Sequence, residues 1–116
     1  MPRMFHHIGL TTDTPQPGES WVEKTRVWVT DPDDHPQKIE WLRYEADSPV
    51  DPDFQARPHI AYTTDSLEEA MAGKTIVLEP MEVGDPPFGR AVFVEEDGAI
   101  VEYIERYEGR RWFDED

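Results

Sequence analysis

A repeated segment constrains the fold of this chain more than any other feature. Residues 7–13 read HIGLTTD, and residues 59–65 read HIAYTTD. The two segments share His, Ile, Thr, Thr and Asp at a constant offset of 59 − 7 = 52 residues. The two unmatched pairs exchange Gly for Ala and Leu for Tyr, which keeps a small residue small and an apolar residue apolar. A repeat of this length in a chain of 116 residues indicates two related halves.

A second pair of segments repeats in the same order. Residues 38–42 read KIEWL and residues 100–104 read IVEYI, so each places one Glu inside an apolar strand that bears an aromatic residue. The length of the chain suits a single domain. We therefore predict one domain with a Pro- and Asp-rich linker near residues 48–53. Its parts are module one at about residues 1–50, module two at about residues 58–108, and a tail at 109–116.

Module two reads as β-α-β-β-β. The Ser-x-x-Glu pattern from Ser66 to Glu69 is a capping box that starts a helix, and Gly73 ends it. The dipeptide Asp97-Gly98 predicts a hairpin turn. A loop rich in Pro and Gly is expected over Glu82–Gly89. The predicted strands are His59–Thr64, Thr75–Glu79, Arg90–Glu95 and Ala99–Arg106.

Module one reads as a degenerate copy of module two. Residues 14–18 hold two prolines where module two has its helix, so a full helix is not expected there. A turn is predicted over Asp31–Asp34. This leaves one strand fewer than in module two, or one that is too short to recognise. The predicted strands are Phe5–Thr11, Lys24–Thr30 and Gln37–Glu45.

Two His and two Glu occupy equivalent positions in the two modules. If a pseudo-two-fold axis relates the modules, His7 corresponds to His59 and Glu40 to Glu102, and all four side chains can meet at one point. Such a donor set suits a divalent ion such as Zn, Mn, Fe, Co or Ni. The chain has no cysteine, so no thiolate can serve as a ligand. For each residue alone, an ordinary hydrogen bond or an exposed position remains the alternative.

The remaining histidines are given other roles. His6 is expected on the opposite strand face, packed or at the surface, and His35 in an exposed turn. The side chains expected either to line a pocket or to pack in the core are Phe5, Trp28, Leu42, Tyr44, Val92 and Val94. The arginines that could bind an anionic substrate, or offset surface carboxylates, are Arg26, Arg43 and Arg90.

The charge of the chain excludes some partners. With 11 basic and 26 acidic residues the formal net charge is −15, which argues against binding to nucleic acid or to an anionic membrane. The N-terminal segment has no signal-peptide pattern, and no apolar segment is long enough to span a bilayer. The sequence therefore predicts a cytoplasmic protein.

At these residues the chain resembles the vicinal oxygen chelate superfamily, which includes glyoxalase I and the bleomycin-resistance-like proteins. The likeness is carried by HIGL at 7–10, PHIAY at 58–62 and GAIVEYIE at 98–105. The resemblance implies an α+β fold in which two βαβββ modules form a cupped mixed sheet around a metal, the first module lacking a full helix. It also implies a homodimer, to which Trp112 and Phe113 could contribute.

The resemblance further implies a metal site and its chemistry. The implied metal ligands, one from the first and one from the last strand of each module, are His7, Glu40, His59 and Glu102. The ion would stabilise an enolate-type oxyanion of a small substrate with vicinal oxygens. Four ligands indicate an isomerase, lyase or epimerase with Glu102 or Glu40 as general base.

Two alternatives remain open from the sequence. Three ligands, two His and one Glu, would indicate a dioxygenase or a thiol transferase instead. A metal-free protein that binds and sequesters a small molecule, as in drug resistance, is the other alternative. The presence of both His and both Glu favours a metalloenzyme over such a binding protein.

Overall fold

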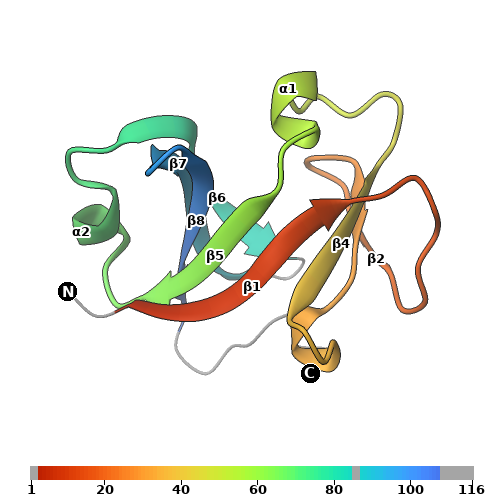
Figure 1. The fold of residues 1–116 in the computed structure, drawn as a ribbon, viewed down its shortest axis with the longest axis horizontal. Coiled ribbons are helices and arrows are strands. Elements are labelled where there is room, and N and C mark those ends of the chain that lie inside the picture. The colour runs from red at the N-terminus through yellow and green to blue at the C-terminus, as the bar shows by residue number, and fades with distance from the viewer. Residues whose placement is uncertain (1–2, 85–86, 108–116) are drawn as a thin grey trace. The chain divides into compact units, whose positions relative to one another are not determined.

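The protein has a sheet-dominated α+β fold with a few short helices (Figure 1). A computed structural model describes residues 3–84 and 87–107, so the tail 109–116, with Trp112 and Phe113, lies outside the described residues. Within those ranges no helix has the length and apolar character needed to cross a membrane. The elements are β1 (Arg3–Thr11), β2 (Ser20–Val22), β3 (Val27–Val29), the 3-10 helix η1 (Pro32–Asp34), β4 (Ile39–Tyr44), α1 (Pro52–Gln55), β5 (His59–Thr64), α2 (Leu67–Met71), β6 (Thr75–Gly84), β7 (Pro87–Glu96) and β8 (Ala99–Arg106).

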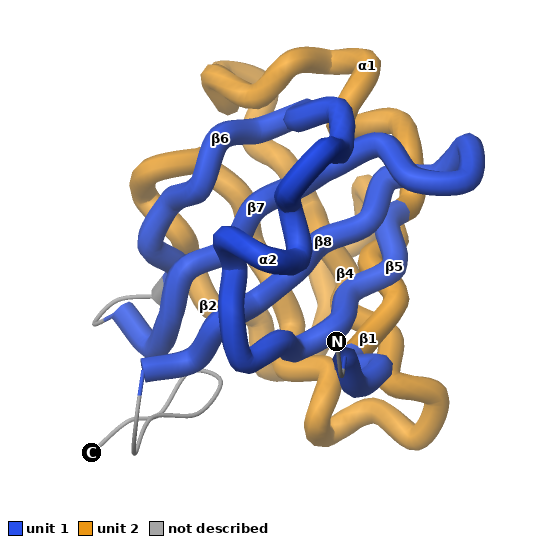
Figure 2. Tube along the Cα trace, turned by 90° about the vertical axis from the view of Figure 1, so that its left-hand side faces the viewer, with its two compact units in different colours: residues 1–6, 59–116 blue, residues 7–58 orange. Residues whose placement is uncertain are grey.

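The chain forms two compact units, and strand β1 contributes to both (Figure 2). Unit 1 comprises residues 1–6 and 59–116, and unit 2 comprises residues 7–58. The strands make a mixed eight-stranded sheet in the order β2-β3-β4-β1-β5-β8-β7-β6. In unit 1, β5 pairs in parallel with β8, which is followed by antiparallel β7 and β6. In unit 2, β1 pairs in parallel with β4, which is followed by antiparallel β3 and β2. The two units therefore share one internal strand order.

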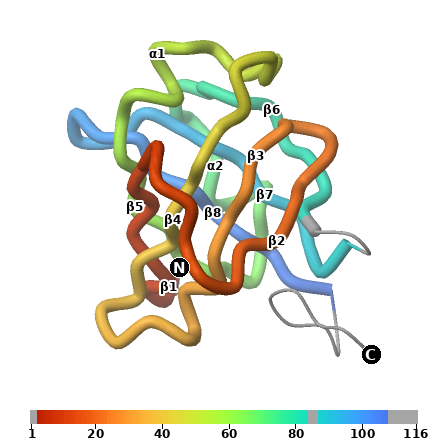
Figure 3. The backbone as a smooth tube through the Cα atoms, turned by 90° about the vertical axis from the view of Figure 1, so that its right-hand side faces the viewer, coloured from red at the N-terminus to blue at the C-terminus, as the bar shows by residue number. Residues whose placement is uncertain are grey.

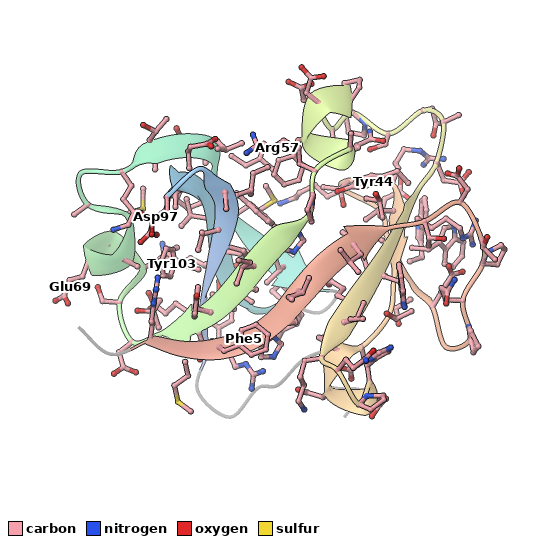
Figure 4. The ribbon with its side chains drawn as sticks, viewed as in Figure 1. Phe5, Tyr44, Arg57, Glu69, Asp97 and Tyr103 are labelled. Carbon is pink, nitrogen blue, oxygen red and sulfur yellow. The ribbon has the colours of Figure 1, made fainter. Side chains whose placement is uncertain are left out.

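Unit 1 buries apolar side chains on both faces of its strands. On one face, α2 packs on β7 and β8 (Figure 2) through a cluster that also holds the half-buried Tyr62, Met71 and Ile76. The buried members of this cluster are Leu67, Ala70, Val92, Val94, Val101 and Tyr103. A second cluster consists of Ala61, Phe88, Ala91 and Ile104, with Val83 packed against it. Figure 4 shows Tyr103 on the side of β8 toward α2.

Local signals fix the ends of α2 and the turn after β7. Ser66 caps the helix, since its side chain accepts a hydrogen bond from the Glu69 backbone N–H at 3.2 Å. Gly73, with φ of 74°, follows the helix. Asp97 and Gly98 have φ of 56° and 81°, as a two-residue hairpin turn with two left-handed residues requires (Figure 4). These predictions are confirmed.

The predicted loop over residues 82–89 is wrong in part. Strand β6 continues to Gly84 and β7 begins at Pro87, because their backbones pair, with Glu82 opposite Arg90 and Val83 opposite Gly89. Register shifts interrupt this ladder, and β6 lies at the end of the strand order, where a proline in a strand is tolerated. The prediction assigned the prolines and glycines of this segment to a loop. Pairing between the two strands places Gly84, Pro87 and Gly89 in β6 and β7 instead.

Unit 2 is built from shorter strands (Figure 3). The strand predicted over residues 24–30 starts only at Val27, because a turn with Arg26 at φ of 50° joins β2 to β3. Strand β2 has three residues, so the missing strand of module one is one that was too short to recognise. No helix occupies residues 14–18, as predicted.

The segment predicted as a linker holds a short helix. Residues 52–55 form α1, which begins with Pro52 and is capped by the Asp51 side chain, accepting from the Asp53 backbone N–H at 2.9 Å. Phe54 of this helix is buried, 8% exposed. A linker that buries an aromatic ring is a packed part of unit 2.

Candidate metal centre

The first half of the candidate site lies in unit 1. His59 is the first residue of β5 and Glu102 lies in the middle of β8. Their side chains approach at 3.2 Å from Nε2 to Oε1, and each is only 5% exposed. The Phe93 ring lies edge-on against the His59 imidazole, with ring centres 5.2 Å apart. An aromatic ring thus helps to keep water from this pair.

The second half lies in unit 2. His7 of β1 and Glu40 of β4 approach at 3.3 Å from Nε2 to Oε1, with side chains 0% and 6% exposed. His7 is the most deeply buried of the four residues. The pair therefore matches the His59–Glu102 pair in residue types, distance and burial.

The same strand register produces both pairs. In unit 1, Glu102 lies opposite Ala61, which is two residues after His59. In unit 2, Glu40 lies opposite Gly9, which is two residues after His7. Side chains two apart on a strand share a face, so each His shares a face with the Glu of the parallel neighbour. The small residue opposite each Glu leaves room for the carboxylate to turn toward the imidazole.

The chemistry of these donors fits a divalent metal. A carboxylate buried at this depth needs a cation or several hydrogen bonds to offset its lost hydration. The distances of 3.2 and 3.3 Å stand at or beyond the long end of an N–H···O hydrogen bond, which is about 2.7–3.2 Å. Two ligands of one ion at bond lengths of about 2.0–2.2 Å would stand at a similar separation. Each unit therefore offers one buried imidazole and one buried carboxylate, which are donor types that a divalent ion accepts.

The other histidines have different surroundings. His6 is buried, 8% exposed, and its Nε2 lies 2.8 Å from Nη2 of Arg106. His35 is half-buried, and its Nδ1 accepts a hydrogen bond from the Gln37 backbone N–H at 3.0 Å. Of the two positions predicted for His6, packed or at the surface, the structure shows the packed one. The prediction of an exposed His35 is wrong, since its side chain is half-buried and bonded within the turn.

Most of the side chains that could have lined a pocket lie away from the two His–Glu pairs. Val92 and Val94 are fully buried under α2, on the face opposite Phe93, whose backbone position faces Glu102. Phe5 is 52% exposed and contacts Tyr62 edge-on, with ring centres 6.4 Å apart (Figure 4). These three are packing residues rather than pocket residues.

Unit 2 divides its candidates between two faces. Leu42 and Tyr44 follow Glu40 at spacings of two along β4 and share its face. Trp28 lies opposite Arg43 and therefore points to the other face, where its Nε1 donates to Glu45 at 2.9 Å. Of the six candidates, Leu42 and Tyr44 keep a position beside a predicted ligand.

The three predicted anion-binding arginines are all paired with carboxylates. Arg43 donates to both oxygens of Glu19, which lowers the pKa of Glu19. Arg26 lies 2.7 Å from Asp47 and lowers the pKa of that carboxyl group. The third, Arg90, bridges Glu68 and Glu105. These arginines therefore offset acidic side chains, which is the second of the two roles predicted for them.

Sequence reasoning did not identify Phe93 or the small residues Gly9 and Ala61 as parts of the site. A signal for the small residues was present, because both repeats read His-Ile-small at 7–9 and 59–61. The contact of Phe93 with His59 depends on the pairing of β7 with β8, which no local pattern reveals.

Comparison with known proteins finds a similar fold but no matching family. No protein-family model matches the chain, and no curated protein matches it. Its fold is similar to the crystal structure of the hypothetical protein BH1468 from Bacillus halodurans C-125, with a TM-score of 0.71 and 18% identity. That match covers 97% of this chain and 100% of the other. At this identity the likeness establishes a shared fold and nothing about activity.

Proposed function

We propose that this protein is a metal-dependent enzyme of the vicinal oxygen chelate type, in which His7, Glu40, His59 and Glu102 hold one divalent ion. The observation that carries the proposal is the repetition of a buried His–Glu pair in both units with the same strand register. A chance ion pair has no reason to recur at equivalent positions of a repeat. The mixed sheet and the short helices are compatible with the fold of that superfamily.

The reaction we propose is an isomerase, lyase or epimerase type of proton transfer on a small substrate with vicinal oxygens. A bound divalent ion supplies Lewis-acid stabilisation of negative charge that develops on a substrate oxygen. Glu102 or Glu40 acts as the general base that takes a proton from the carbon next to the carbonyl group. Burial of both carboxylates keeps bulk water away from that proton.

A metal site with three protein ligands is the second candidate. Two imidazoles and one carboxylate, from His7, His59 and Glu102, form the donor set that suits an iron-dependent dioxygenase or a thiol transferase. In that version Glu40 acts as the base and not as a ligand. The ligand count therefore separates the two reaction classes.

Metal content tests the proposal directly. Protein purified without chelators or added metal is analysed by elemental mass spectrometry, and we expect about one transition-metal ion per chain. His59→Gln and Glu102→Gln should remove the ion, whereas the matched controls His35→Gln and Glu79→Gln should keep it. Glu79 is exposed and His35 is half-buried. Circular dichroism checks that each variant is folded.

A metal-free result would change the class of protein. If the purified chain holds no metal and takes none up on titration, a metal-free binding protein replaces the enzyme. For the reaction itself, a panel of 2-oxo and 2-hydroxy carbonyl compounds is incubated with the metal-loaded protein in D₂O. We expect deuterium at the carbon next to the carbonyl group by NMR, and none with the Glu102→Gln variant.

A further inference from the structure

A hollow of about 360 Å³ lies at the start of β1 and the ends of β5 and β8, all within unit 1. Arg106 lines it and lies four residues after Glu102 on the same face of β8. Between them Ile104 is fully buried against Ala61, Phe88 and Ala91. This apolar layer separates the hollow from the His59–Glu102 pair, so the hollow is a site of its own.

Two charged residues that line the hollow are already paired. Arg3 donates to the Tyr103 hydroxyl at 2.7 Å, lies 3.6 Å from Glu96, and stacks over the Tyr62 ring at 4.0 Å. Glu105 accepts hydrogen bonds from the Leu67 backbone N–H at 2.9 Å and from Arg90 at 3.3 Å.

Arg106 is different, because one of its donors is buried without a partner. Its Nη2 lies 2.8 Å from the His6 imidazole, while its Nε is buried and has no hydrogen-bond partner among the described residues. Among the described residues it has no ion pair with a carboxylate. A guanidinium carries five N–H donors and stays charged at any ordinary pH. A buried donor without a partner is costly, so this group gains from any oxygen ligand that reaches it.

We propose that this hollow binds a small oxyanion, a carboxylate or a phosphate group, on Arg106. The Nε and one Nη of a guanidinium can donate to two oxygens of one anion, which is the paired geometry that arginine favours. The Thr63 hydroxyl, which also lines the hollow, supplies a further donor. The exposed Asp65 carboxylate at the rim opposes the anion. The chain's charge of −15 opposes it too, so the affinity depends mainly on Arg106.

NMR titration of the metal-free protein tests this site without involving the proposed metal centre. Protein dialysed against a chelator is titrated with inorganic phosphate and, separately, with acetate, which distinguishes the two kinds of anion. We expect saturable shifts of the backbone amides of Thr63, Asp65 and Arg106 with at least one probe. The indole N–H signals of Trp21 and Trp28 in unit 2 should not move. No saturable shift with either probe would overturn the proposal.

Charge-matched variants make the test specific. Arg106→Gln should raise the dissociation constant about tenfold or more. Arg26→Gln removes the same charge from an arginine in unit 2 and should leave it unchanged. Asp65→Asn should lower it, because a repulsive charge is lost from an exposed position beside the hollow. Equal weakening by Arg26→Gln, or no tightening by Asp65→Asn, would contradict a local site on Arg106.

Discussion

Glu40 and Glu102 differ from the other acidic residues of this chain in their burial. They are 5% and 4% exposed, whereas most carboxylates here face water. Both also interrupt runs of apolar residues in a strand. A carboxylate in such a position costs stability unless a cation or a set of donors offsets its charge, and this is why we propose that both carboxylates hold the ion.

The role of Glu40 decides the ligand count. Loss of a hydrogen-bond partner outside the ligand set weakens metal binding by about 10–100-fold. If Glu40 is a ligand, we expect Glu40→Gln to weaken metal binding by more than this. Competition with a chromophoric chelator measures the affinity, and Glu79→Gln is the control. Unchanged affinity and unchanged turnover would exclude Glu40 as a ligand and as a base, and would leave the three-ligand site.

The Glu19–Arg43 pair predicts that the stability of unit 2 falls at acid pH. The pair joins Glu19, 10% exposed, to Arg43 at 2.6 Å, and hydrogen bonding from Arg43 lowers the pKa of Glu19 below its ordinary 4.5. A carboxyl group with a lowered pKa in the folded state contributes stability above the ordinary value. That contribution is lost as the pH falls through the lower folded pKa.

Urea unfolding between about pH 3 and pH 7 checks this linkage. Glu19→Gln should lower the unfolding free energy near neutral pH and should flatten its decline on the acid side. The exposed Glu79→Gln change should do neither. An acid decline that is as steep in Glu19→Gln as in the parent protein would contradict the role of this pair.

At the scale of elements, strands β7 and β8 carry unit 1. They pair over eight residue positions from Gly89–Arg106 to Glu96–Ala99, and both apolar clusters rest on them. Gly89 lies opposite Arg106, close to the backbone of β8. A Cβ built there would lie 2.5 Å from the Glu105 carbonyl oxygen and 3.0 Å from Cα of Arg106. Both neighbours are main-chain atoms that cannot turn away.

We therefore expect Gly89→Ala to destabilise the protein by about 1–3 kcal/mol, the usual cost of overpacking. Urea unfolding followed by tryptophan fluorescence measures the change. The expected loss of stability comes from the close contact of the added Cβ. It does not come from backbone conformation, because Gly89 is not among the glycines with positive φ. A variant as stable as the parent would show that β7 and β8 can separate there at little cost.

The elements that the sequence predicted well are those with strong local signals. Strands β5 and β8 have the predicted bounds, and the Ser66 cap of α2 is confirmed. Strands β6 and β7 are longer than predicted because pairing, not composition, decides where a strand ends. Of the two roles predicted for Val92 and Val94, packing in the core is the one that they have, because the alternation of side chains along β7 turns them toward α2. On β1 that alternation breaks, since consecutive His6 and His7 are both buried.

At the scale of the whole molecule, the described strands include two, at the ends of the strand order, that have a pairing partner on one side only. Strands β2 and β6 are these terminal strands. Unpaired edges invite pairing with another chain unless charge or irregularity blocks it. Strand β6 has register shifts in its ladder, and the chain is strongly acidic, which together limit uncontrolled pairing.

We expect the protein to form a homodimer of defined size. Light scattering coupled to size exclusion should give about twice the mass of one chain, in a form that persists on dilution. The charge of −15 makes association dependent on salt, so the measurement is repeated at low and moderate ionic strength. A single-chain mass under both conditions would contradict the expectation.

The sequence alone determined the repeat, the residue types of the candidate site and the capped and turned ends of its local elements, because these depend on neighbours within a few residues. On charge it also predicts that nucleic acid is not a partner. Only the tertiary structure decided that Glu102 lies opposite Ala61 and that Glu40 lies opposite Gly9. It likewise decided that Arg106 keeps an unpaired donor. Those facts depend on which strands pair and in what register, and this is set by packing between segments that lie far apart in the chain.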